Sequence, residues 1–185
     1  MAKIKLAPHI KPLALVTAFV LNAIHSAPAQ DASLEDRVKA TFILNFIQFA
    51  EWPRATVPSG SSFPVCIVGD AFQAVMEETV RGETVNGQPI SVRGLTQAKD
   101  AAGCRVIYFR DSANRATSQE ILNTAKASPV LTVGEAPEFL SNGGIVRFTR
   151  VRNRIHFQIN PSAAEKVAIS ISSRLLRLAD IVRLQ

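Results

Sequence analysis

The chain has 185 residues, enough for one domain with a real hydrophobic core but not for two. Its formal net charge is +6, from 21 basic and 15 acidic side chains. The basic residues form no run interleaved with aromatic residues, so the positive charge gives poor support for nucleic-acid binding.

Residues 1–29 have the pattern of a secretion signal peptide. Three lysines give a positive start, a short apolar run follows from Leu13 to Ile24, and Ala27-Pro28-Ala29 supplies small residues where a signal peptidase reads them. We expect cleavage before Gln30 and a mature domain of residues 30–185. The apolar run is short for a bilayer span, which makes a permanent membrane anchor the minor alternative. No cysteine lies directly after the apolar run, at the expected cleavage site, which argues against a lipid-anchored lipoprotein.

Removal of this segment changes the counts of charged and metal-binding residues. The number of basic side chains falls from 21 to 18, which leaves the mature chain near +3. His156 is the only histidine that remains, so a multi-histidine metal site is excluded. Cys66 and Cys104 both remain, and in an oxidising compartment two cysteines can make one pair. Such a disulfide, closing a loop of about 38 residues, would contribute roughly 4 kcal/mol on the chain-entropy model.

The stretch 34–53, LEDRVKATFILNFIQFAEWP, predicts a buried helix around which the chain packs. Ser33 is a good N-cap residue, Asp36 lies at the acidic position of a capping box, and Pro53 forces a stop near Trp52. The apolar stripe has helical spacing and is widened by two isoleucines. Its members are Leu34, Val38, Phe42, Phe46 and Phe49, with Ile43 and Ile47 beside them.

Strands and helices then alternate. Apolar runs at 63–69, 104–110 and 129–133 predict buried strands, and 89–94 predicts a strand at or near an edge after a turn at Asn86-Gly87. A first helix is expected at 70–80, capped by Asp70. A second helix is expected to begin after its cap, Asp111 or Ser112, and to run to about residue 127. A further helical turn or two is expected at 136–140. This order indicates a parallel sheet with right-handed crossovers.

The pattern changes after Gly143-Gly144. Residues 145–150 and 154–160 predict a β-hairpin with a turn at Arg152-Asn153, and a helix is expected from Pro161 to Val182. The predicted fold class is α/β: a single domain with a mostly parallel sheet flanked by helices, a C-terminal β-hairpin and a terminal helix.

One candidate binding strip lies on the hairpin. Arg154, His156 and Gln158 share one face of the second strand, and Arg147 and Thr149 are expected opposite them. Such a basic strip could bind a phosphate, a carboxylate or an acidic partner surface. The alternative is an ordinary solvated strand face.

Other chemistry has weaker support. The Gly69-Asp70 and Arg110-Asp111 turns lie at the carboxyl ends of predicted parallel strands, where open sheets hold ligands, but these aspartates could simply cap helices. No GxGxxG, P-loop or GxSxG motif is present, and the cysteines do not form a CxxC motif. We therefore expect no enzyme activity and no cofactor.

Several motifs, in order, give the chain a resemblance to a known family. These motifs are distributed from the beginning of the mature chain to its C-terminal part. They are Val38-Lys39-Ala40, Asn45-Phe46, Phe49, Glu51-Trp52-Pro53, Cys66-Ile67-Val68-Gly69-Asp70, Gly103-Cys104, Gly143-Gly144-Ile145, Phe157-Gln158-Ile159-Asn160 and Ser173-Arg174-Leu175-Leu176-Arg177-Leu178-Ala179. In this combination the chain resembles the YfiR family.

The resemblance implies a small periplasmic α/β protein without a known catalytic role. Its best-understood relative represses a membrane-bound diguanylate cyclase by binding the cyclase's periplasmic sensory domain, and the redox state of the cysteines modulates repression. By resemblance, Cys66 and Cys104 occupy the positions of a family cysteine pair. They could form a redox switch, an inert disulfide or two buried thiols. The second pair found in some members has no counterpart here.

The sequence thus predicts a periplasmic regulator, cyclic di-GMP signalling as its context, and an inner-membrane diguanylate cyclase or related sensor as its partner. Leftover apolar surface could also support a homodimer. The alternative function is a periplasmic small-ligand-binding domain without a protein target, using the carboxyl edge of the sheet.

Overall fold

The computed structural model describes residues 33–53, 61–69 and 72–184. The predicted signal peptide, the predicted cap Asp70 and most of the loop after Pro53 lie outside the described residues. Within the described ranges, no helix is long and apolar enough to cross a membrane.

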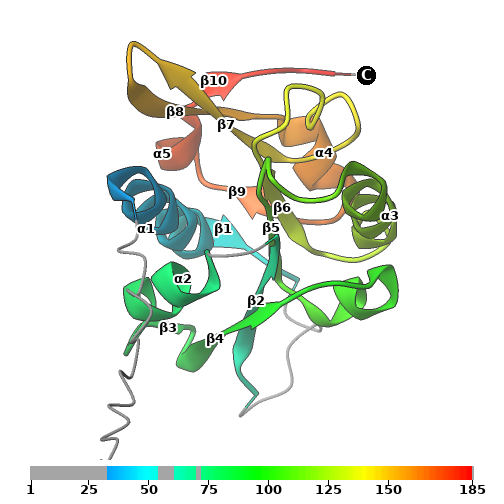
Figure 1. Ribbon diagram of the computed structural model, residues 1–185. Helices are drawn as coiled ribbons and strands as arrows, with labels where there is room; N and C mark the ends of the chain where they lie inside the picture. The colour runs from blue at the N-terminus through cyan, green and yellow to red at the C-terminus, as the bar shows by residue number, and fades with distance from the viewer. Residues whose placement is uncertain (1–32, 54–60, 70–71, 185) are drawn as a thin grey trace, which may run out of the picture. The chain divides into compact units, whose positions relative to one another are not determined.

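An eight-stranded sheet forms the centre of the domain, in the order β10-β8-β7-β6-β5-β2-β4-β3 (Figure 1). Neighbouring strands run parallel except in the β3–β4 and β7–β8 pairs, which confirms the predicted α/β class. The strands are β2 (Phe63–Val68), β3 (Thr84–Val85), β4 (Gln88–Gly94), β5 (Val106–Phe109), β6 (Leu131–Gly134), β7 (Val146–Val151), β8 (Arg154–Ile159) and β10 (Asp180–Ile181).

Helices cover both faces of the sheet because its central strands are apolar on both sides. Helices α1 (Leu34–Phe49) and α2 (Gln73–Thr79) pack on the face that carries Val65, Ile67 and Tyr108. Helix α3 (Arg115–Ala125) and the 3₁₀ helix η2 (Ala98–Gly103) cover the opposite face, which carries Cys66 and Ile107. The two hydrophobic clusters are thus separated by the sheet itself.

Helix α1 begins as predicted, but its buried face is centred differently from the predicted stripe. The Asp36 amide donates to Ser33 Oγ over 3.1 Å, which confirms the N-cap. Leu34 is 79% exposed, so the predicted stripe is wrong at its start. The fully buried apolar residues are Ala40, Ile43, Phe46 and Ile47, so Phe46 is confirmed, and the two isoleucines expected beside the stripe lie at its centre. Phe42 and Phe49 are partly buried against this core. The helix ends at Phe49 because Ala50–Glu51 forms the short strand β1.

Two turn predictions are confirmed and one cap prediction is wrong. Asn86-Gly87 connects β3 to β4, and Arg152-Asn153 connects β7 to β8, with positive φ at all four residues. Helix α3 starts later than expected: Asn114, not Asp111 or Ser112, caps it by accepting a hydrogen bond from the Thr117 amide. The stretch 136–140 forms turns rather than a helix.

The predicted C-terminal helix is divided. It consists of α4 (Pro161–Lys166), the short strand β9 (Ser170–Ile171), α5 (Ser173–Leu176) and then β10. Helix α4 stops because Ala168 has a φ of +57°, a left-handed conformation that helices do not contain. Strand β9 pairs antiparallel with β1, so backbone hydrogen bonds connect the C-terminal segment to the residues directly after α1.

Candidate functional site

The β7–β8 hairpin brings the predicted strip together. Thr149 pairs with His156 and Arg147 pairs with Gln158, as the sequence predicts. Arg154 and His156 are exposed, whereas Gln158 is half-buried and accepts a hydrogen bond from Arg147 Nη1 at 3.4 Å. These side chains alternate with Phe157 and Ile159, which enter the core. The strip is therefore a solvent-facing polar surface on a firmly packed strand.

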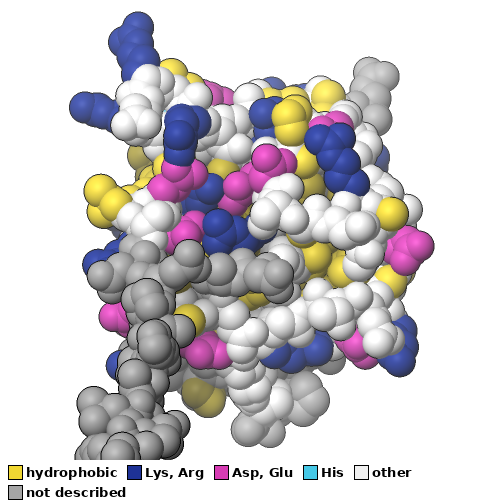
Figure 2. All heavy atoms as spheres, viewed as in Figure 1, with side chains coloured by type: hydrophobic (Ala, Val, Ile, Leu, Met, Phe, Trp, Pro, Cys, Tyr) yellow, Lys and Arg dark blue, Asp and Glu magenta, His cyan; other side chains and the backbone are white. Residues whose placement is uncertain are grey.

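The turn of the hairpin adds a positive charge beside this strip. Arg152 and Arg154 are exposed, and Figure 2 shows Lys and Arg side chains projecting at the upper left, where the hairpin ends in Figure 1. Arg150 lies on the opposite face of the hairpin, because it pairs with Ile155. Arg150 forms an ion pair with Glu35 of α1, which links the hairpin to that helix. Arginine suits the recognition of carboxylates because its guanidinium can donate two parallel hydrogen bonds.

The two cysteines form a disulfide between β2 and the residue after η2. The Cα atoms of Cys66 and Cys104 lie 6.0 Å apart, because β2 and β5 are neighbours in the sheet. Both residues are buried, with 0% and 1% of their surface exposed. Arg93 of β4 lies opposite Cys66, and its Nη2 atom is 3.4 Å from Cys104 Sγ and 3.1 Å from the Asp100 carbonyl oxygen. A reductant can thus reach the disulfide only if the surrounding structure opens.

A group of charged residues that sequence reasoning missed lies between α1 and the carboxyl ends of β5 and β6. Lys39 is only 5% exposed, and its Nζ atom contacts Glu35 at 2.7 Å and Glu135 at 2.9 Å. Glu135 follows β6 and also accepts a hydrogen bond from the hydroxyl of Tyr108 in β5. The sequence carries only a weak signal of this group: Lys39 is a cation one turn before the apolar Ile43, but nothing local identifies Glu135 as its partner.

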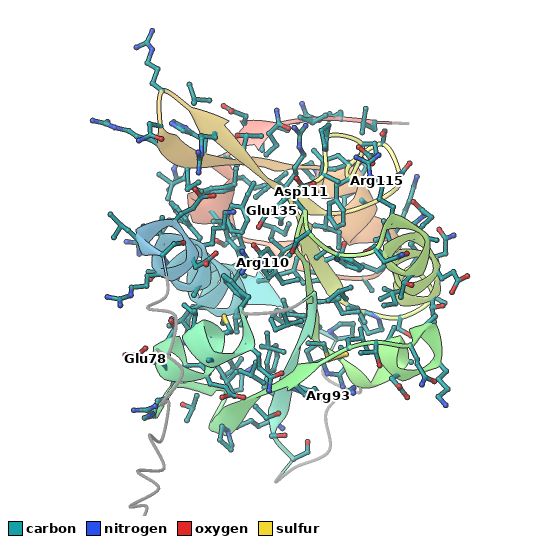
Figure 3. The ribbon with its side chains drawn as sticks, viewed as in Figure 1. Glu78, Arg93, Arg110, Asp111, Arg115 and Glu135 are labelled. Atoms are coloured by element: carbon teal, nitrogen blue, oxygen red, sulfur yellow. A yellow bond between two sulfur atoms is a disulfide. The ribbon has the colours of Figure 1, made fainter. Side chains whose placement is uncertain are left out.

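A second ion pair extends this group. Arg110, directly after β5, has its Nη2 atom 3.4 Å from Asp36 Oδ1, and its guanidinium lies over the Phe72 ring. Figure 3 shows Arg110 and Glu135 close to α1, and Figure 2 shows acidic and basic side chains side by side there. Burial, and then the neighbouring carboxylate of Glu135, raise the pKa of Tyr108. This group ties α1 to the sheet.

The carboxyl edge of the sheet offers little room for the ligand considered from sequence. Arg110 and Asp111 line a hollow of about 100 Å³ between β5, α3 and the turn after β6. Pockets for small molecules usually measure at least about 300 Å³. The other predicted turn at this edge includes Asp70, which lies outside the described residues. The described part of this edge is better suited to ion pairing within the protein.

Comparison with known families decides the identity of this fold. A family model described as YfiR/HmsC-like matches residues 36–180. The chain belongs to the YfiR/HmsC-like family. At family level these proteins are periplasmic regulators of diguanylate cyclases, not enzymes. The match includes the hairpin strip, both cysteines and, apart from Glu35, the charged group at α1.

One solved structure supports the fold, and a second one aligns more weakly. A conserved domain protein from Vibrio cholerae O1 biovar El Tor aligns with a TM-score of 0.51 at 14% identity, over 77% of this chain and 59% of that one. An ABC domain in complex with L-Trp from Streptococcus pneumoniae aligns with a TM-score of 0.44 at 11% identity, over 69% and 57%. The chain thus spans less than two thirds of either protein. No curated protein matches the sequence.

Proposed function

We propose that this member of the YfiR/HmsC-like family is exported to the periplasm and represses an inner-membrane diguanylate cyclase by binding the cyclase's periplasmic domain. Family membership over residues 36–180 is the observation that carries this proposal. The regulator acts stoichiometrically: it binds the inactive state of its partner more tightly than the active state and so shifts the population towards inactivity.

The hairpin strip is the proposed contact surface. Arg154 and His156 are exposed on a strand whose other face is locked in the core, so they can meet a partner without a change in the backbone. Gln158 is positioned by its hydrogen bond from Arg147. The neighbouring Arg152 makes the surface more basic, which favours an acidic patch on the partner.

The disulfide supports this surface indirectly. It joins β2 to the start of β5, on the opposite side of β6 and β7 from the hairpin strand β8. Because both cysteines are buried, a redox effect on the partner would act through the stability of the whole domain. Redox modulation through Cys66 and Cys104 is thus proposed as a change in the amount of folded regulator.

The test is capture of the partner by the mature chain. Tagged residues 30–185 are incubated with solubilised inner membranes of the source cell, and recovered proteins are identified by mass spectrometry. We expect a protein with a diguanylate cyclase domain. Arg154→Glu should weaken its recovery at least about tenfold, since it replaces an attractive charge with a repulsive one at the proposed interface.

Arg81→Glu is the matched control. Arg81 is also exposed and undergoes the same change of charge, but it lies between α2 and β3 at the opposite edge of the sheet. Equal loss in both variants would indicate a general electrostatic effect and would remove the hairpin from the proposal. Recovery of no cyclase, with bait concentrations that detect micromolar binding, would contradict the proposed partner.

A further inference from the structure

A hollow of the size that small molecules occupy lies away from the carboxyl edge of the sheet. A cavity of about 310 Å³ lies between the end of α3, the turns at 140–143, the start of β7, and α4. Its walls combine apolar and polar side chains in about equal measure, and Leu184 of the C-terminal segment is among them. Figure 1 shows α3 and α4 side by side, with the yellow connection from β6 to β7 beside them. The apolar wall residues are Ala125, Val130, Leu140, Ile145, Ala163, Val167 and Leu184.

Two buried polar side chains also line this cavity. Thr132 and Asn160 are each 3% exposed. The Thr132 oxygen accepts a hydrogen bond from the Ile145 amide, and the Asn160 side-chain oxygen accepts one from the Ala163 amide. These hydrogen bonds use the acceptor capacity of the two side chains. A hydroxyl and a carboxamide also carry donor groups, which a ligand in the cavity could use.

The rim of the cavity is cationic. Lys126 and Lys166 line it, and no Asp or Glu is among the described residues that do so. Lys126 lies over Gly143, and its Nζ atom is 3.1 Å from Asn123 Oδ1, a neutral partner that leaves its charge uncompensated. Lys166 ends α4 and forms no ion pair with the described residues. Each lysine lies at the C-terminal end of a helix, where a positive charge is favourable.

We propose that this cavity binds a small organic carboxylate with an apolar body. Lysine ammonium groups at the rim would receive the carboxylate, the walls would bury the hydrocarbon part, and Thr132 or Asn160 would donate to a polar atom within the cavity. The volume equals that of about ten water molecules in the liquid, which sets the scale of the ligand. This site is independent of the proposed hairpin contact, because it is lined by α3 and α4 and by none of Arg154, His156 and Gln158.

Other ligand classes fit less well. A bare anion such as inorganic phosphate would leave the apolar walls uncovered. A neutral hydrocarbon would leave the two lysines and the other polar lining groups without a counterpart. A cation is disfavoured by the absence of acidic residues among the described lining residues and by the two ammonium groups.

Calorimetric titration of the mature chain with octanoate tests the proposal. We expect one saturable site with a Kd below about 1 mM, and at least about tenfold weaker binding of 1-octanol and of inorganic phosphate. Lys126→Met/Lys166→Met should reduce octanoate binding to the level of octanol. Lys99→Met is the control, because Lys99 is exposed on η2 and does not line the cavity.

A second variant keeps the test valid if the lysine variant loses stability. Ala163→Phe places a ring in the cavity and should abolish octanoate binding, and its thermal unfolding shows whether the domain remains folded. Equal binding of octanoate and octanol, equal binding by wild type and both variants, or no saturable binding at millimolar octanoate would each overturn the proposal.

Discussion

The Nζ atom of Lys39 lies 2.9 Å from Oε1 of Glu135, which joins the middle of α1 to the carboxyl end of β6 in a nearly water-free position. Glu135 is held from a second side by Tyr108, and Lys39 from a second side by Glu35. Because a buried charge is tolerated only with a partner, the position of α1 on the sheet depends on this pair.

Loss of Lys39 should be strongly destabilising. Lys39→Met keeps the length and apolar stem of the side chain but leaves the largely covered Glu135 carboxylate without its cation. We expect the free energy of unfolding to fall by about 3 kcal/mol, measured by urea denaturation at neutral pH.

The double variant Lys39→Met/Glu135→Gln separates charge from packing. A glutamine at position 135 can still accept the Tyr108 hydrogen bond, and no unpaired charge remains, so most of the lost stability should return. If the double variant is as unstable as Lys39→Met, the cost lies in packing and the account of this pair is wrong.

In the folded domain, Tyr108 should not ionise at the pH at which an exposed tyrosine ionises, about 10. It is the only tyrosine of the chain, so absorbance at 295 nm reports its ionisation directly. Burial and the Glu135 carboxylate raise its pKa. The stability that depends on the neutral phenol is present below the unfolded-state pKa of about 10 and is lost as the pH rises above it.

We therefore expect tyrosinate absorbance to rise only together with unfolding. Far-UV circular dichroism, recorded over the same alkaline titration, should change at the same pH. In Tyr108→Phe this part of the alkaline destabilisation should be absent. Tyrosinate formation near pH 10 with unchanged circular dichroism would contradict the buried position of the phenol.

The sequence predicts the sheet better than the packing of its helices. Continuous apolar runs identify β2, β5 and β6, because strands buried on both faces have no polar alternation. The hairpin strip is also predictable, since period two places Arg154, His156 and Gln158 on one face. The buried face of α1 is not predictable from the sequence, because it includes the charged Lys39. Lys39 can be buried only because it forms an ion pair with Glu135, which is distant in the sequence.

The C-terminal helix was mispredicted for a related reason. Helical periodicity continues through Val167, Ile171 and Leu175, yet Ala168 is left-handed and Ser170–Ile171 pairs with β1. A local pattern does not reveal that the end of α1 provides a strand partner. The cavity is likewise not predictable from a sequence motif, because its lining residues come from α3, the β6–β7 connection, α4 and the C-terminal segment, which are separate in the sequence.

The disulfide should stabilise the domain and resist reduction in the folded state. Its closed loop predicts that Cys66→Ala/Cys104→Ala loses about 4 kcal/mol of unfolding free energy. Since both cysteines are buried, thiol release by dithiothreitol under native conditions should follow the rate of opening rather than the concentration of the reductant.

Thiol titration at increasing dithiothreitol concentrations measures this rate, and denatured protein provides the control for rapid reduction. Reduction of the folded domain at the same rate as the denatured chain would show that the disulfide is accessible. Equal unfolding free energies of wild type and the double alanine variant would show that it does not stabilise the fold.

Gly144 should tolerate no side chain because Phe139 occupies the space. A Cβ atom at Gly144 would lie 2.2 Å from Phe139 Cε1 and 2.8 Å from the Phe139 carbonyl oxygen. We expect Gly144→Ala to lower the free energy of unfolding by about 2 kcal/mol. In Gly94→Ala the new methyl group meets only the end of the Gln73 side chain, at 3.3 Å, so this control should change stability little.

The most direct test of the proposed function is the activity of the cyclase itself. Cyclic di-GMP production by the solubilised partner is measured while the mature chain, Arg154→Glu or Arg81→Glu is added in increasing amounts. The account predicts that wild type and Arg81→Glu inhibit production and saturate at a fixed stoichiometry, whereas Arg154→Glu requires at least about tenfold more protein. Production that is unaffected by saturating wild-type protein would contradict the central claim that this chain is a repressor.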